Sequence, residues 1–292
     1  MEPIGTWLTG FGIAAVAGVA YSAGYEVNAY TLRKVDVPIV PAGGKEISVL
    51  HLSDLHMTPW QTKKQDWLKG LAALEPDLVV VTGDFLGFKD AVAPVLDALA
   101  PLGKFPGVFV FGSNDYYGPK FKNPVQYLLK DKGIRIHDDP LPWRDLKTGL
   151  ESFGWDDLTH RRVSKNLGGV TYEFRGVDDP HLKLDKYVEV QGPVAADHVG
   201  IGVTHAPYLR ILDAMEADGV SLIFAGHTHG GQLCIPGYGA LVTNCDLDTK
   251  RAKGLHQHGD SWLHVSAGLG TNPYTPVRFA CRPEATHIRF LH

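Results

Sequence analysis

Short apolar runs alternate with amphipathic stretches along most of this chain. Several of the runs are continuous and rich in valine, which is typical of strands buried on both faces. The stretches between them place apolar residues at helical spacing. We therefore expect strands over residues 47–52, 78–82, 108–111, 134–136, 201–204 and 222–225, and helices over residues 64–74, 92–102 and 124–132. This alternation predicts an α/β fold with helices on the faces of the sheet.

The beginning of the chain has a different pattern. Residues 4–25 carry no charge, and a helix needs about 20 such residues to cross a bilayer. The five glycines in this stretch weaken a helix in water, so we predict a membrane-anchor helix over residues 1–30 rather than a buried N-terminal helix. Glu2 and the lack of an early Lys or Arg argue against a cleaved signal peptide.

The residues after this segment indicate its orientation and the start of the globular part. Arg33 and Lys34 follow the apolar stretch, which by the positive-inside rule predicts a membrane-anchored protein with a cytoplasmic catalytic domain. Two prolines and a Gly-Gly pair are typical of a connector, so we interpret residues 31–45 as a linker and residues 46–292 as one domain.

Composition and charge exclude several functions. With 44% hydrophobic and 21% charged residues, the chain of 292 residues has the composition of a globular protein. Its formal net charge of −4 offers no basic excess for a phosphate backbone, so no nucleic-acid partner is expected. The three cysteines include no CxxC pair, which argues against both a disulfide framework and a thiolate zinc site.

Polar side chains follow five of the predicted strands at the point where each strand ends. Because ligands bind at the carboxyl ends of strands in open α/β sheets, we expect these side chains to converge on a metal site. Alone, each Asp is more typical of a turn or a helix N-cap, and each His of a loop. The residues, in chain order, are Asp54, His56, Asp84, Ser113, Asn114, Asp115, His205, His227 and His229.

The residue types indicate which metals fit. Carboxylate and imidazole ligands without thiolates favour Mn, Fe or Zn, and a carboxylate such as Asp84 can bridge two ions. The other histidines, His181 among them, lack such partners and are expected at the surface or in hydrogen-bonded core positions.

At these residues the chain resembles the calcineurin-like metallophosphoesterases, whose pattern is DxH, GD, GNH[DE], a histidine after a strand, and GHxH. The matching segments are Asp54-Leu55-His56, Gly83-Asp84, Gly112 to Asp115, His205 and Gly226-His227-Thr228-His229. The later stretch GHTHGGQLCIPGYG resembles small bacterial members with an N-terminal membrane or export segment. The resemblance implies two facing mixed β-sheets flanked by helices.

The same resemblance implies a ligand set and a reaction. Asp54, His56 and His229 are expected to hold one divalent ion, and His205, His227 and an amide oxygen the other, with Asp84 between them. Two such ions bind a phosphoester oxygen and a water and lower the pKa of that water. The function that the resemblance implies is hydrolysis of a phosphate mono- or diester. The expected N-terminal anchor adds the membrane as a partner and a lipid-linked ester, beside a small molecule, as a candidate substrate.

One loop departs from the family pattern. Where the family has Gly-Asn-His-[Asp/Glu], this chain has Gly112-Ser113-Asn114-Asp115. Strict register puts Ser113 at the amide-ligand position, but a hydroxyl is a poor ligand, so we predict a local shift that lets Asn114 bind metal. The usual histidine is missing, and loss of a general acid typically costs about 10²–10⁴-fold in rate. Asp115 is expected to orient the loop by hydrogen bonding.

This departure leaves a second hypothesis open. The chain is either a dinuclear phosphoesterase or a metal-binding pseudoenzyme that binds a phosphorylated ligand or a membrane partner without turnover. Two further features are less specific. The aromatic passage with Trp143, Phe153 and Trp155 forms a lid, a membrane-facing surface that grips substrate, or an ordinary helix and loop. Arg278 and Arg282 either meet a phosphate or, as is more usual in an apolar strand, pair with carboxylates.

Overall fold

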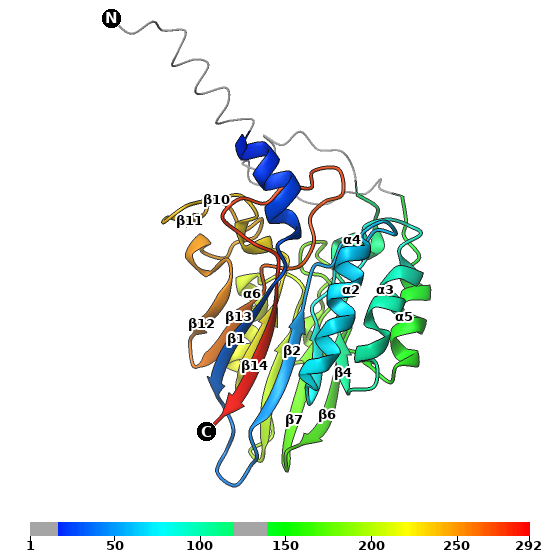
Figure 1. Ribbon diagram of the computed structural model, residues 1–292. Helices are drawn as coiled ribbons and strands as arrows, with labels where there is room; N and C mark the ends of the chain where they lie inside the picture. Colours follow the sequence, from blue (N-terminus) through cyan, green and yellow to red (C-terminus); the bar gives the residue numbers. More distant parts are fainter. Residues whose placement is uncertain (1–16, 120–138) are drawn as a thin grey trace, which may run out of the picture.

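The computed structural model describes residues 17–119 and 139–292, and in these residues two six-stranded sheets lie face to face (Figure 1). The first sheet has the order β1-β14-β2-β3-β4-β5 and comprises β1 (Thr31–Pro38), β14 (Glu284–Leu291), β2 (Ile47–Leu52), β3 (Leu78–Val81), β4 (Gly107–Phe109) and β5 (Asp156–Asp157). The second has the order β12-β13-β9-β8-β7-β6 and comprises β12 (Gly254–His258), β13 (Ser261–Val265), β9 (Val220–Ala225), β8 (His198–Val203), β7 (Val170–Gly176) and β6 (Arg161–Leu167).

Helices cover the outer faces of both sheets. The first sheet carries α2 (Thr62–Gly70), α3 (Val92–Leu99) and α5 (Trp143–Ser152) on one face (Figure 1). The second carries α6 (Leu209–Ala217). Shorter elements are η1 (Tyr21–Tyr25), η2 (Glu26–Asn28), η3 (Leu71–Leu74), η4 (Ala100–Leu102), α4 (Ser113–Tyr116), η6 (Tyr187–Glu189), η7 (His229–Gly231), η8 (Thr249–Arg251), β10 (Cys234–Ile235) and β11 (Gly239–Ala240).

The alternation of side chains along the central strands explains this layering. In β3, Val80 faces the second sheet, whereas Val79 and Val81 face the helices. Successive side chains of a strand point to opposite faces, so a strand covered on both sides needs an apolar residue at every position. The prediction of a mixed α/β fold with two sheets and flanking helices is therefore confirmed.

The strand directions bring the loops that carry the predicted ligands to one edge of the two sheets. Strands β2, β3 and β4 are parallel neighbours, and so are β8 and β9. Parallel strands end at the same side of a sheet. The loops after β2, β3, β4, β8 and β9 therefore meet at the carboxyl ends of the two sheets, as the sequence predicts.

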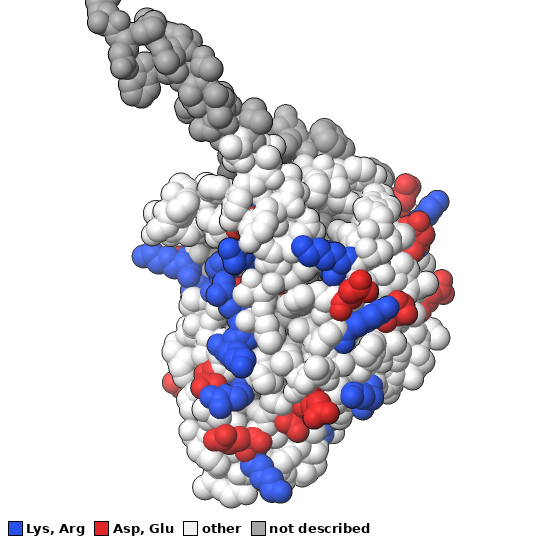
Figure 2. Space-filling model, in the orientation of Figure 1, with Lys and Arg blue, Asp and Glu red and all other residues white. Residues whose placement is uncertain are grey.

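The predicted membrane localisation is wrong. Residues 17–20 are α-helical and continue into η1 and η2, and no helix within residues 17–119 and 139–292 is long and apolar enough to cross a membrane. The remainder of the predicted anchor, residues 1–16, lies outside the described residues. The described part exposes Val19, Tyr21 and Tyr25. In Figure 2 the described surface next to the grey atoms at the top is mostly white, with few charged side chains.

Other expectations for single segments have different outcomes. Part of the expected linker forms β1, which pairs in parallel with β14 from Thr31↔Glu284 to Pro38↔Leu291. The predicted helix over 124–132 and strand over 134–136 lie outside the described residues. The aromatic passage forms α5 and a buried turn in which Trp155 donates to the Phe105 carbonyl at 3.1 Å, so it is an ordinary part of the core.

Candidate metal centre

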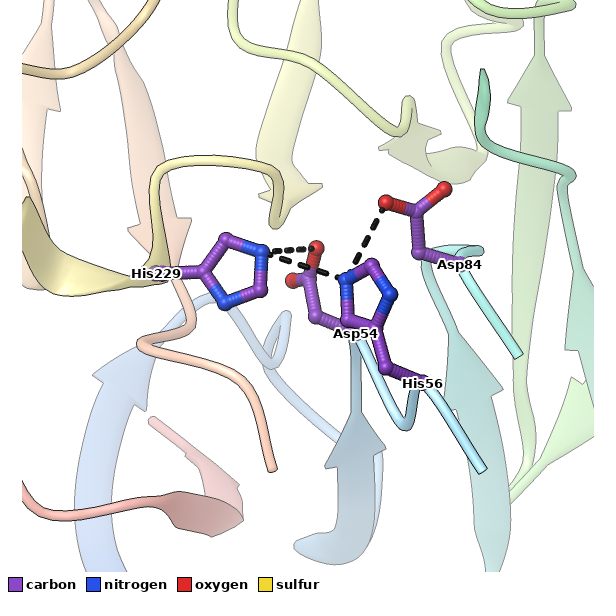
Figure 3. Close-up of side chains that lie close together, drawn as sticks. All are labelled: Asp54, His56, Asp84 and His229. Atoms are coloured by element: carbon purple, nitrogen blue, oxygen red, sulfur yellow. Dashed lines mark hydrogen bonds and ion pairs between the residues drawn. The ribbon is translucent and has the colours of Figure 1, made fainter. Parts of the chain in front are cut away.

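Four of the predicted ligands form a compact group at the carboxyl ends of the strands. One ligand atom each from Asp54, His56, Asp84 and His229 lies within 4.8 Å of the other three (Figure 3). His56 Nε2 is 3.4 Å from Asp84 Oδ2 and 3.2 Å from His229 Nε2, and His229 Nε2 is 3.6 Å from Asp54 Oδ1. These four side chains come from the loops after β2, β3 and β9.

A second group meets the first at Asp84. His205 Nε2 lies 3.5 Å from Asp84 Oδ2 and 3.4 Å from His227 Nδ1. The Nδ2 atom of Asn114 donates to the same Oδ2 at 2.7 Å. Rotation of a carboxamide exchanges its oxygen and nitrogen, so either atom of Asn114 can face this position. Ser113 Oγ instead lies 3.5 Å from Asn114 Nδ2.

Backbone carbonyls fix the orientation of three histidines. The Nδ1–H of His205 donates to Thr82 O at 2.7 Å, the Nδ1–H of His229 to Gly270 O at 3.1 Å, and the Nε2–H of His227 to Asn244 O at 3.3 Å. In His227 and His229, which are neutral, the other nitrogen then carries the lone pair and faces the neighbouring ligands. In His205 the other nitrogen, Nε2, faces Asp84. This is the second-shell arrangement of histidines that bind metal.

The backbone at the ligands is unusual. Left-handed φ values are uncommon for residues other than glycine, and each typically costs about 1–3 kcal/mol unless the surroundings hold it. Such outliers concentrate at functional sites. The residues concerned are Asp54 (φ 49°), His56 (φ 39°), Asp84 (φ 55°), His227 (φ 68°) and His229 (φ 49°).

Asp115 holds two of the loops together. Its carboxylate is fully buried and accepts from the N–H groups of Asp84 at 2.8 Å, Phe85 at 2.7 Å, Leu86 at 3.1 Å and Gly112 at 2.9 Å. These bonds tie the loop after β3 to the loop after β4. Asp115 therefore orients the backbone that carries Asp84.

Two glycines allow the loops to approach this closely. A Cβ at Gly226 would lie 1.8 Å from Ser53 Oγ and 2.6 Å from Asp54 Oδ2. A Cβ at Gly112 would lie 2.3 Å from Asp84 Oδ1. A larger residue at Gly112 therefore displaces the Asp84 carboxylate, and one at Gly226 displaces Ser53 or Asp54.

The electrostatics suit a cation. Burial lowers the pKa of His56 to about 4 and holds the pKa values of His227 and His229 well below 6.5, so these rings are neutral ligands at pH 7. For His205, burial lowers the pKa, but the charge and hydrogen bond of the neighbouring Asp84 carboxylate raise it, and the net pKa of His205 lies well above 6.5. Burial also raises the pKa of Asp54 to about 6. Neutral imidazoles around buried carboxylates fit divalent cations.

Three residues beside the centre were not anticipated from the sequence. The His181 ring lies 4.6 Å from the His227 ring, centroid to centroid, and its Nδ1 is 3.1 Å from Tyr208 Oη. His181 is partly buried and hydrogen-bonded, which fits the expected class of position, but no motif in the sequence indicates that it lies beside the centre. Lys64 is fully buried beside the Asp54–His56 turn, with Nζ 2.6 Å from Leu55 O.

Arg278 is the third such residue. It is fully buried, and its Nη2 lies 3.5 Å from His229 Nδ1. The expected carboxylate partner is replaced by four backbone carbonyls, those of Ala267, Gly268, Gly270 and Cys281. This guanidinium therefore organises the loop that supplies the Gly270 carbonyl to His229.

Comparisons with known proteins agree with the geometry. A family model described as calcineurin-like phosphoesterase matches residues 47–231. The chain is 30% identical over 250 residues to YkoQ of Bacillus subtilis, an uncharacterized metallophosphoesterase, with 83% of each chain covered. It is 22% identical over 289 residues to the phosphodiesterase YaeI of Escherichia coli, covering 96% of this chain and 95% of that protein.

Two further similarities extend beyond bacteria. A Bos taurus protein named as a transmembrane protein with a metallophosphoesterase domain is 27% identical over 285 residues, which is 94% of this chain and 60% of that protein. Among solved structures, a dimetal phosphatase from Danio rerio matches with a TM-score of 0.43 at 11% identity, over 80% of this chain and 88% of that one.

Proposed function

We propose that this chain, which belongs to the calcineurin-like phosphoesterase family, works as a phosphoester hydrolase with two divalent ions that share Asp84. The observation that carries this proposal is the meeting of two ligand groups at Asp84 Oδ2, which lies 3.4 Å from His56 Nε2 and 3.5 Å from His205 Nε2. Asp54, His56 and His229 are the further ligands of the first ion. Asn114, His205 and His227 are those of the second.

The residue types favour Mn, Fe or Zn, because the donors are carboxylate, amide and imidazole groups without thiolates. Ions bound here supply a Lewis acid for the phosphoester and lower the pKa of water. The chain's own residues set the geometry for this chemistry. Thr82, Asn244 and Gly270 orient three of the rings through their carbonyls, and Asp115 fixes the turn at Asp84.

We propose a phosphodiester with a good leaving group as the substrate. The name of YaeI, a phosphodiesterase, supports the diester. The leaving group follows from the loop after β4, where Asn114 stands at the position of the family's usual histidine. A carboxamide donates hydrogen bonds but is not acidic enough to protonate a leaving group, so turnover depends on a leaving group that departs without protonation.

The experiment is hydrolysis of bis(p-nitrophenyl) phosphate and of p-nitrophenyl phosphate by purified protein with Mn²⁺. We expect metal-dependent release of p-nitrophenol, faster from the diester, and loss of that activity in Asp84→Asn. The matched control is Asp97→Asn, a surface carboxylate paired with Lys69 far from the centre, which keeps the activity. Equal turnover in Asp84→Asn and the parent overturns the proposal.

The loop after β4 also favours a second candidate, a metal-binding protein that holds a phosphorylated ligand without turnover. Its motivation is the same replacement of histidine by Asn114. The substitution Asn114→His separates the two. A large gain of hydrolysis over an inactive parent favours the binding protein, whereas an active parent favours the enzyme.

A further inference from the structure

A small pocket lies behind the metal centre, between α2 and the N-terminal helical segment. Its volume is about 120 Å³. Liquid water takes about 30 Å³ per molecule, so the pocket has room for roughly four waters or one tetrahedral oxyanion. It is lined by residues of three segments, namely the stretch from Ala23 to Tyr30, the start of α2, and the loop from Leu269 to Pro276.

The single charged side chain in this lining is the Lys64 ammonium, which is only 1% exposed. Its Nζ donates to Leu55 O at 2.6 Å and to Gln61 Oε1 at 3.0 Å, and both acceptors are neutral. A buried ammonium without a carboxylate is destabilised, and burial lowers the pKa of Lys64 to about 7. An ammonium has three N–H groups, so one remains for a further ligand.

The N-terminal end of α2, which contains Lys64, adds positive potential. Gln61, the N-cap residue, lines the pocket and makes no side-chain cap bond. The first N–H groups of a helix have no intrahelical acceptor, and together they carry about half a positive charge. A helix N-terminus is therefore a general anion site, and here the buried Lys64 stands beside it.

No acidic residue opposes this charge in the lining. Glu26, which belongs to the N-terminal helical segment, accepts from the N–H groups of Ala280 and Cys281. The remaining polar groups of the lining, including those of Asn28, Tyr30 and Thr271, are neutral. The Tyr30 hydroxyl donates to Asn28 Oδ1 at 3.5 Å and Asn28 Nδ2 donates to Gly24 O at 3.1 Å, so Asn28 retains one amide hydrogen for an anion.

We propose that this pocket binds a phosphate-like oxyanion, held by the ammonium of Lys64 and the N-terminus of α2. The anion provides a third, charged acceptor for the buried Lys64 ammonium, whose other two acceptors are neutral. It also adjoins the metal centre on two sides. Gly270, which lines the pocket, accepts from His229 Nδ1, and Leu55, the acceptor of Lys64, lies between Asp54 and His56.

The test measures binding without catalysis. The protein is treated with EDTA, and its thermal unfolding is followed while inorganic phosphate is added, with KCl at equal ionic strength as reference. A ligand that binds the folded state raises Tm by mass action. We expect phosphate to raise Tm in the parent and in Lys63→Met, an exposed neighbouring lysine, but not in Lys64→Met.

A second variant tests the pocket independently of whether Lys64→Met folds. Ala23→Leu fills the pocket from the N-terminal segment and leaves the lysine in place, so it too abolishes the rise in Tm. No phosphate effect in the parent, or the same effect in Lys64→Met, overturns the proposal. Because metal-free protein is used, this outcome is independent of whether the chain hydrolyses phosphodiesters.

The anion has two possible sources, a free phosphate or a second phosphoryl group of the substrate. In metal-loaded protein, KM is compared for an ester with one phosphate and for an ester of pyrophosphate. A rise in KM of Lys64→Met confined to the pyrophosphate ester identifies the substrate as the source. Unchanged KM for both esters, together with the lost effect on Tm, identifies free phosphate.

Discussion

Asn114 bonds to both oxygens of Asp84. Its backbone N–H donates to Oδ1 at 2.8 Å, and its Nδ2 donates to Oδ2 at 2.7 Å. Ser113, which strict register would make the ligand, reaches Asn114 and not the carboxylate. The carboxamide is thus the group of this loop that lies where the two ligand groups meet.

We therefore expect Asn114→Ala and Ser113→Ala to behave differently. Loss of an outer-shell partner typically costs about 10–100-fold in metal affinity or activity, and loss of a ligand costs more. Asn114→Ala should lose the weaker of the two bound ions and most of the activity, while Ser113→Ala keeps both. Metal content and Mn²⁺ titration measure the difference, and equal losses in the two variants contradict the assignment of Asn114.

Gly226 sets how closely the loop after β9 approaches the loop after β2. A methyl group there meets Ser53 Oγ at 1.8 Å, so Gly226→Ala must displace Ser53 or Asp54. We expect a loss of about 1–3 kcal/mol in the free energy of unfolding, together with loss of metal binding. Gly70→Ala is the matched control, because its Cβ meets nothing within 4 Å and the residue ends α2. A metal-binding Gly226→Ala refutes this account.

His205 makes metal binding depend on pH. Burial lowers the pKa of His205, but the charge and hydrogen bond of the Asp84 carboxylate raise it, and the net pKa lies well above 6.5. The metal-free ring is therefore protonated at pH 7. A ligand imidazole must be neutral, and binding of the ion therefore releases about one proton. Affinity should fall as pH falls.

Calorimetry in buffers of different ionisation enthalpy measures this proton. His205→Gln should release fewer protons than the parent, because its side chain does not titrate. The metal-free protein shows the opposite trend with pH. A raised folded pKa contributes stability below the unfolded value, near 6.5, and this contribution is lost as pH rises through the folded pKa. Proton release that is equal in parent and variant contradicts the prediction.

The sequence predicts the centre well because local patterns determine it. The apolar run over residues 47–52 coincides with β2, and the residues that follow it, Asp54 and His56, lie in the first ligand group. A strand buried on both faces leaves a continuous apolar signal, and the sharp exit from it leaves a glycine or a polar turn residue. Both signals lie within a few residues.

Pairings between distant parts of the chain leave no such signal. Strand β1 is held at the sheet edge by β14, with Thr31 opposite Glu284, although its own residues look like a connector. His181 reaches His227 only because the loop after β7 lies beside the loop after β9. In such cases tertiary packing decides the position, and a single sequence does not report it.

Arg278 provides the last test, because its partners also come from tertiary structure. Arg278→Met removes the donors to four carbonyls and leaves them buried, and hydrogen bonds to a charged group contribute about 1.5–3 kcal/mol each. We expect a loss of at least about 3 kcal/mol in the free energy of unfolding, with weaker metal binding because Gly270 orients His229. The exposed Arg282→Met should stay within about 0.5 kcal/mol. Denaturant unfolding compares the two, and equal stabilities would show that solvent replaces the lost donors.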